Sequence, residues 1–132
     1  MRIVWTNGCF DILHRGHFEM LKYAKSLGDH LIVGIDTSAK VKKDKGPHRP
    51  YNSTDDRMFA LECIKFVDEV KIFNSEKNLE LLIKQIEPDY MVIGSDWKGK
   101  RVVGQQYTRN LVFFDRIGNY STTNILEHNN EN

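Results

Sequence analysis

The sequence has little cysteine, little proline and almost no excess charge. Its 132 residues include two cysteines and three prolines, and 19 basic against 18 acidic side chains give a formal net charge of +1. The two cysteines, Cys9 in a loop-like Asn-Gly-Cys-Phe stretch and Cys63 in an apolar helical pattern, suggest neither a disulfide framework nor a zinc site. The charge balance gives no global electrostatic reason to expect a nucleic-acid or membrane partner. An anionic ligand must therefore be held by local basic groups.

Long apolar segments are also missing. No run approaches the ~18 residues that a transmembrane helix needs, and the start, MRIVWTNGCF, lacks the long apolar segment of a signal peptide. With 40% apolar and 28% charged residues, the composition is ordinary for a globular protein. We expect a cytoplasmic protein with one domain over residues 1–127 and a polar tail over residues 128–132.

Short continuous apolar runs alternate with helical patterns along the chain. The apolar runs predict strands at 3–5, 31–35, 70–73, 90–93 and 111–114. The helical patterns predict helices at 16–27, from Ser53 or Thr54, at 79–86 and from residue 121. Residues 38–50, with four lysines and two prolines, predict a mobile basic loop. The order indicates an α/β protein: a single Rossmann-like three-layer domain with a mostly parallel five-stranded sheet and helices on both faces.

Polar and unusual residues follow the predicted strands where each strand ends. In an open parallel sheet, ligands bind beyond the carboxyl ends of the strands, so these loops should meet at one edge. They read Thr6-Asn7-Gly8-Cys9-Phe10-Asp11, Asp36, Asn74-Ser75, Gly94-Ser95-Asp96-Trp97 and Arg116. The sequence therefore predicts a ligand site at this edge of the sheet.

A His-x-Gly-His segment, His14 to His17, enters the first predicted helix directly after that edge. At this spacing the two imidazoles lie on one face of the helix, and Gly16 lets a phosphate approach the backbone between them. The helix start adds unpaired N–H groups and a partial positive charge. A phosphoryl-transfer transition state requires such a set of fixed donors. Two surface histidines beside a glycine are the simpler alternative.

Other nucleotide-binding motifs are missing. No G-x-G-x-x-G follows the first strand and no Walker-type loop occurs, which argues against the dinucleotide-binding dehydrogenase and P-loop classes. A tRNA-charging enzyme uses the His-x-Gly-His pattern in the same way but requires a much longer chain. No further Cys or His lies at zinc-ligand spacing, so we assign no residue to a metal. A non-catalytic nucleotide-binding module stays in view as a rival.

Two segments over a hundred residues apart carry a family resemblance. TNGCFDILHRGH, residues 6–17, resembles the first signature of the cytidylyltransferase-like nucleotidyltransferase superfamily, and RIGNYSTTNIL, residues 116–126, resembles the second. KGPHRPYNSTDDRM and GSDWKGK extend the resemblance through the middle of the chain. The resemblance implies an enzyme that moves a nucleoside monophosphate from a nucleoside triphosphate to a phosphorylated small molecule and releases pyrophosphate.

The resemblance also implies roles for individual residues. Catalysis falls on His14, His17 and Lys45, with Lys42 and Lys43 as weaker candidates beside Lys45. Nucleotide binding falls on Thr6, Asn7, Gly8, Phe10, Gly16, Asp96, Arg116, Ser121, Thr122 and Thr123. Acceptor binding falls on Asp11 and Arg57. The implied cofactor is Mg²⁺, and the implied assembly is a homodimer without a nucleic-acid or membrane partner.

Two subgroups of the superfamily share further segments with this chain. TNGCFDILHRGH, GPHRPYNSTDDR and RVVGQQY resemble the heptose 1-phosphate adenylyltransferase domain, which uses ATP in the synthesis of cell-surface polysaccharide precursors. GSDWKGK and the spacing of Arg116 resemble glycerol-3-phosphate cytidylyltransferase, which uses CTP. The whole chain favours the heptose type, and the glycerol type is the alternative. The residues alone leave the base and the acceptor open.

Overall fold

Five parallel strands form one sheet in the computed structural model, which describes residues 1–115. The strands are β1 (Ile3–Gly8), β2 (His30–Asp36), β3 (Glu69–Phe73), β4 (Tyr90–Gly94) and β5 (Asn110–Phe114), in the spatial order β3-β2-β1-β4-β5. The predicted α/β class and parallel five-stranded sheet are confirmed. The helix expected from residue 121 and the tail over 128–132 lie outside the described residues.

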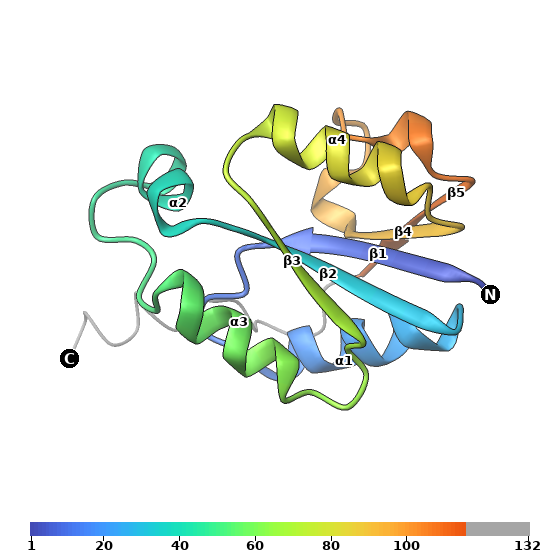
Figure 1. Ribbon diagram of the computed structural model, residues 1–132, viewed down its shortest axis with the longest axis horizontal. Coiled ribbons are helices and arrows are strands. Elements are labelled where there is room, and N and C mark those ends of the chain that lie inside the picture. Colours follow the sequence, from blue (N-terminus) through green and yellow to red (C-terminus); the bar gives the residue numbers. More distant parts are fainter. Residues whose placement is uncertain (116–132) are drawn as a thin grey trace.

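Helices cover both faces of the sheet (Figure 1). One face packs against α1 (Arg15–Ser26) and α3 (Thr54–Glu62), and the other packs against α4 (Glu76–Ile86) and the segment 95–109. Neighbouring strand residues enter different cores: Val4 lies in the first and Trp5 in the second. Strands buried on both faces must be apolar at successive positions, which is why they read as continuous runs.

The described α-helices begin at side chains that accept a backbone N–H. These N-caps are His14 for α1, Thr37 for α2 (Ser38–Lys45), Ser53 for α3 and Ser75 for α4. Each cap satisfies one donor that the first helical turn leaves without an intrahelical partner. Capping by Ser75 starts α4 earlier than the predicted residue 79, because the apolar pattern does not reach the first turn.

The prediction of a loop over residues 38–50 is wrong for its first half, where α2 forms. Thr37 caps this helix by accepting the N–H of Lys40, Val41 is fully buried, and Lys40 forms an ion pair with Asp44 one turn on. Lysine is a good helix former, so four lysines do not oppose a helix once a cap and one apolar anchor are present. Gly46, at a φ of 105°, ends it in a conformation that favours glycine.

The chain moves from β1 outward to β2 and β3, then crosses to β4 on the other side of β1. The β1–β2 ladder runs from Ile3 to Gly8, whereas the β1–β4 ladder covers only Val4 and Trp5. Beyond Trp5 the two strands therefore separate. This is the point where strand order reverses, and it is where ligands bind in open α/β sheets. Among the described residues, no helix has the length and apolarity to span a membrane.

Candidate functional site

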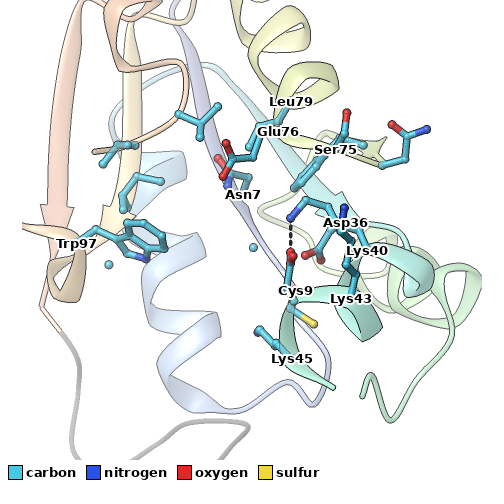
Figure 2. A pocket seen from close by; sticks show the side chains of 18 residues that line it. Asn7, Cys9, Asp36, Lys40, Lys43, Lys45, Ser75, Glu76, Leu79 and Trp97 are labelled. Carbon is cyan, nitrogen blue, oxygen red and sulfur yellow. Dashed lines mark hydrogen bonds and ion pairs between the residues drawn. The ribbon is translucent and has the colours of Figure 1, made fainter. Parts of the chain in front are cut away.

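A cleft of about 810 Å³ opens at the carboxyl ends of the strands (Figure 2). It is lined by the ends of β1, β2, β3 and β4, by α2, by the start of α4 and by residues from 97 to 103. Asn7 and Gly8 line it where β1 parts from β4, and Asp36 lines it at the end of β2. The structure confirms that the ends of β1 to β4 meet at one sheet edge, while Arg116 after β5 lies outside the described residues.

The walls of the cleft differ in charge. Lys40, Lys43 and Lys45 line it from α2, and Trp97 lies on the opposite side (Figure 2). The start of α4 contributes Glu76. Cationic side chains on one wall can hold phosphate oxygen atoms, while an exposed indole offers a flat apolar surface.

His14 and His17 form the first turn of α1, at the end of the loop that follows β1. The N–H of Gly16 donates to Nδ1 of His14 over 3.1 Å, and the N–H of His14 donates to Nδ1 of His17 over 3.2 Å. The two rings lie with their centroids 3.9 Å apart. This pair is a capping box built from imidazoles in place of the usual Ser and Glu.

The capping geometry fixes which nitrogen carries the proton. A neutral imidazole has one donor and one acceptor nitrogen, and here both Nδ1 atoms are acceptors. The proton of each neutral ring therefore sits on Nε2. Burial, together with the neighbouring His14, lowers the pKa of His17 from 6.5 to about 4. At neutral pH, His17 is an uncharged Nε2–H donor of fixed orientation.

The lowered pKa of His17 leads to a prediction about pH. We expect NMR titration of the His17 ring to give a midpoint near 4 rather than 6.5. Because the unfolded chain takes up this proton near 6.5 and the folded chain only near 4, the His17 contribution to stability should be lost as pH falls through that window. Spectra of a His17→Asn variant would assign the resonance. A midpoint at or above 6.5 would mean that water reaches the ring.

Phe10 shapes the loop between β1 and α1. It is 5% exposed, has a left-handed φ of 49°, and its ring lies 5.3 Å from that of His17. A Cβ on Gly8 would approach the Phe10 ring to 3.3 Å, so glycine leaves room for this packing. A bulky residue at positive φ is strained, and the burial of Phe10 holds it there.

Three predicted ligand contacts fall on residues that the structure buries. Thr6 is 1% exposed, Asp11 is 4% exposed and Arg57 is 1% exposed, and none of them lines the cleft. The Asp11 carboxylate accepts the N–H groups of Tyr51 and Asn52 at 2.6 and 2.7 Å. The described contacts of Asp11 and Arg57 are thus internal to the protein. Direct contact of these residues with a substrate stays a prediction that the described contacts do not support.

The other predicted nucleotide-binding residues lie in two groups. Asp96 is exposed just after β4, beside the cleft-lining Trp97 but outside the lining itself. Arg116, Ser121, Thr122 and Thr123 lie outside the described residues. Their convergence with His14 and His17 therefore stays a prediction.

Several cleft residues were given no individual role from the sequence. Asp36, Asn74 and Ser75 stand at strand ends that the sequence analysis placed at the ligand edge, and the structure puts them in the cleft lining. Lys40 was hidden in the segment predicted as a loop. Val102 belongs to the segment RVVGQQY before β5, which contributed to the family resemblance but was not assigned to the site.

The lining also includes a thiol and a carboxylate with shifted pKa values. Burial raises the pKa of Cys9, and the charge of Lys45 partly offsets the rise. Burial likewise raises the pKa of Asp36, against the nearby charges of Lys40 and Arg57. A thiol with a raised pKa is a poor nucleophile at neutral pH, so the cleft is better suited to binding than to covalent catalysis.

Within residues 1–115, no group of three or more His, Cys, Asp or Glu side chains could hold a metal ion. Mg²⁺ keeps several waters and is commonly bound through substrate phosphates with only one or two carboxylates. The involvement of Mg²⁺ therefore stays a prediction.

Comparisons with known proteins agree with this geometry. The family model of cytidylyltransferase-like proteins matches residues 5–127. The chain is 46% identical over 124 residues to the bifunctional protein HldE of Campylobacter fetus, and 48% identical over 126 residues to that of Nitratiruptor sp.. These matches cover 94% and 96% of this chain but only 27% of either relative. The chain thus spans about a quarter of the length of these curated relatives.

A solved structure gives the same architecture. The lipopolysaccharide core biosynthesis protein from Thermoplasma volcanium superposes with a TM-score of 0.71 at 27% identity. The match covers 92% of this chain and 99% of that protein. The Thermoplasma volcanium protein is therefore a chain of similar length with the same fold.

Proposed function

We propose, from the premise that this chain belongs to the cytidylyltransferase-like family and is a nucleotidyltransferase, that it transfers AMP from ATP to a heptose 1-phosphate and releases pyrophosphate. The sequence segments that resemble the heptose 1-phosphate adenylyltransferase domain support this choice of substrates. The identity of up to 48% to the HldE proteins adds to that support.

One observation carries the proposal: two imidazoles whose Nδ1 atoms are held by the backbone at the start of α1. Their Nε2–H groups are donors that need no reorganisation when negative charge develops on a phosphoryl group. Such preorganised donors are often the largest single contribution to catalysis. Neither histidine lines the cleft itself, but the Phe10 ring lies next to both the cleft residue Gly8 and the ring of His17, which supports a position near that edge.

The proposed reaction is an in-line displacement at the α-phosphorus. An oxygen of the acceptor phosphate attacks, the bond to the β-phosphate oxygen breaks, and pyrophosphate leaves with the electron pair. A phosphate ester with a second pKa of about 6 is already an anion at neutral pH, so no protein base or nucleophile is required. His14 and His17 stabilise the transition state, and Lys45 with its neighbours on α2 neutralises the phosphates.

Mg²⁺ belongs to the proposal as an ion carried by the triphosphate, where it neutralises phosphate charge. We also propose that the protein is a cytoplasmic homodimer that acts on small molecules without a nucleic-acid or membrane partner. Light scattering on the eluting peak from size exclusion should give the mass of two chains. A mass of one chain at micromolar concentration would refute the dimer.

The direct test is an assay of pyrophosphate release. The four nucleoside triphosphates are each combined with Mg²⁺ and one of several acceptors, including heptose 1-phosphate and glycerol 3-phosphate. We expect the highest rate with ATP and the heptose phosphate. Preference for CTP with glycerol 3-phosphate would select the alternative enzyme, and no release with any pair would refute the transferase function.

Binding in the cleft can be tested separately through Cys9. In a Cys63→Ser background, which removes the exposed cysteine, Cys9 is the remaining thiol and lines the cleft. We expect saturating Mg²⁺–ATP with heptose 1-phosphate to slow alkylation of Cys9 at least about tenfold, with labelling measured by mass spectrometry near pH 8.5 because burial raises the pKa of this thiol. Alkylation of Cys63 in a Cys9→Ser variant provides the matched control, since that thiol is exposed at the end of α3. Equal rates with and without ligands would place binding elsewhere.

A further inference from the structure

Arg57 is a fully buried arginine that the proposed mechanism leaves without a role. It stands on α3 with its side chain 0% exposed, and it does not line the cleft. Burying a guanidinium is costly unless its donors are satisfied. The groups that accept hydrogen bonds from its guanidinium therefore indicate the role of Arg57.

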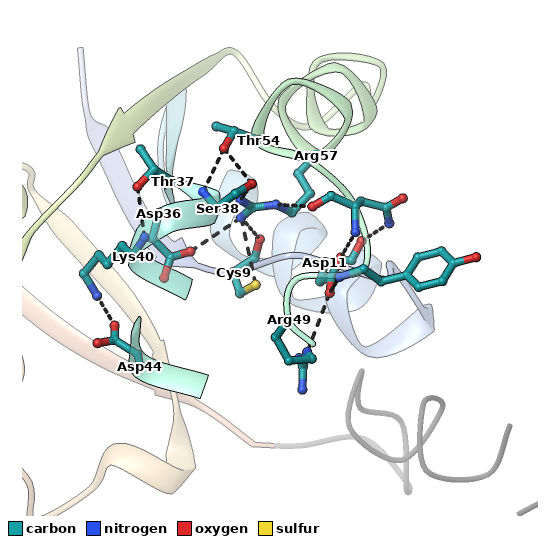
Figure 3. Close-up of polar contacts among 12 residues, drawn as sticks. Cys9, Asp11, Asp36, Thr37, Ser38, Lys40, Asp44, Arg49, Thr54 and Arg57 are labelled. Carbon is teal, nitrogen blue, oxygen red and sulfur yellow. Dashed lines mark hydrogen bonds and ion pairs between the residues drawn. The ribbon is translucent and has the colours of Figure 1, made fainter. Parts of the chain in front are cut away.

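Those partners belong to three separate chain segments (Figure 3). Nη1 donates to the carbonyl of Cys9 over 3.0 Å, in the loop that leads from β1 to the histidines. Nε donates to the carbonyl of Asn52 over 3.1 Å. Nη2 donates to Oγ of Ser38 over 3.5 Å, and Nη1 pairs with the Asp36 carboxylate at 3.5 Å. Asp36 and Ser38 flank the N-cap of α2, the helix that carries the cleft lysines.

We propose that Arg57 is a positioning residue for nucleotidyl transfer: its buried guanidinium joins the Cys9 carbonyl to Ser38 and Asp36, and so sets the position of the lysine helix α2 relative to the histidine loop. This inference rests on the proposed function of that site. The histidines act on the α-phosphorus and the lysines on the surrounding phosphates. Their separation must match one triphosphate, and a misplacement of about 1 Å can cost 10²-fold in rate.

Arginine is suited to this task in a way that lysine is not. Its planar guanidinium presents five N–H donors in a fixed fork, so one side chain can bond in several directions at once. A lysine would keep the positive charge beside the buried Asp36 but could not reach the Cys9 and Asn52 carbonyls together. The conservative variant Arg57→Lys therefore separates the tethering geometry from the charge.

The first measurement is steady-state kinetics of Arg57→Lys. We expect kcat to fall roughly 10- to 100-fold, with KM for each substrate within about threefold of the original value, because the binding groups remain but their alignment is lost. Arg109→Lys is the matched control, since that arginine is 81% exposed and pairs with Asp89 just before β4, at the opposite end of the strands. Unchanged kcat in folded Arg57→Lys would overturn the proposal.

The second measurement is a double-mutant cycle with Lys45→Ala. If Arg57 acts through α2, loss of Lys45 should cost at least about threefold less in the Arg57→Lys background than in the original chain. If Arg57→Lys does not fold, Ser38→Ala replaces it in the cycle. This variant removes the hydrogen bond from Nη2 of Arg57 to Oγ of Ser38. Equal fold-losses in both backgrounds would show independent action and overturn the proposal.

A third readout does not depend on turnover. In the Cys63→Ser background, Arg57→Lys should raise the alkylation rate of Cys9 several-fold, because the loop loses its anchor. If the original chain released no pyrophosphate with any substrate pair, the proposed function would fail, and this rate would still decide whether Arg57 holds the loop. An unchanged rate would overturn the tether itself.

Discussion

Replacing His17 with alanine should lower the turnover of nucleotidyl transfer by roughly 10²–10³-fold while the chain stays folded. The ring supplies a neutral Nε2–H donor, and its Nδ1 accepts the N–H of His14 over 3.2 Å. Removing a preorganised donor to a developing negative charge costs about this much in other enzymes. Steady-state pyrophosphate release, with circular dichroism as the check on folding, measures the effect.

Two further substitutions separate the donor role of His17 from its capping role. The Oδ1 of asparagine can still accept the N–H of His14, but asparagine has no donor at the position of Nε2. We therefore expect His17→Asn to be as inactive as His17→Ala and closer to normal stability. His30→Ala is the control, because His30 begins β2 at the far end of the strand, where it pairs with Glu69 at 3.1 Å. Near-normal turnover in folded His17→Asn would contradict the catalytic assignment.

Replacing Trp5 with alanine should lower the free energy of unfolding by about 3–5 kcal/mol. Trp5 is 0% exposed at the centre of the sheet and packs in the core with Ile83 and Met91. Its surroundings are fitted to the ring: a Cβ on Gly34 in the neighbouring strand would lie 2.5 Å from Cζ2 of the indole. Alanine would leave a cavity that the sheet cannot close. Urea unfolding should show a lower midpoint with an unchanged slope.

Trp97→Ala is the matched control for stability, because this tryptophan is 51% exposed. It should change the free energy of unfolding by no more than about 0.5 kcal/mol, as surface substitutions usually do. Trp5→Phe addresses a further contact, since it keeps most of the packing but removes the 2.8 Å hydrogen bond from the indole to Oδ1 of the cleft residue Asn7. A loss below about 1 kcal/mol in Trp5→Ala would mean that the core is not fitted around this ring.

The strands could be predicted from the sequence because a strand buried on both faces of a sheet is a continuous run of apolar residues. Leu31 and Ile32 enter different cores, so neighbouring positions must both be apolar. The same logic failed for α2, where only Val41 is fully buried. A helix at the sheet edge with one apolar anchor has no periodic pattern, and its cap at Thr37 is a single residue that also suits a turn.

The candidate site was predicted in part for a similar reason. His14, His17 and Gly16 are adjacent in the chain, so their spacing alone places them in one helical turn. Asp11 and Arg57 were predicted to bind the acceptor through the family resemblance, which does not indicate burial, and charged side chains are seldom buried. Their burial is a consequence of contacts with segments 40 or more residues away, at Tyr51 for Asp11 and at Cys9 for Arg57.

The sequence by itself determined the alternation of strands and helices, the parallel sheet and the edge at which the cleft opens, because these follow from apolar periodicity and from chain order. Only the tertiary structure decided which charged groups face the cleft and which are buried, and which nitrogen of His14 and of His17 carries the proton. The burial of charged groups depends on hydrogen bonds between segments far apart in the chain, such as the contact between Arg57 and Cys9. The proton positions of the two histidines depend on the local geometry of the α1 cap. Both outcomes also depend on desolvation, which arises only when the chain is folded.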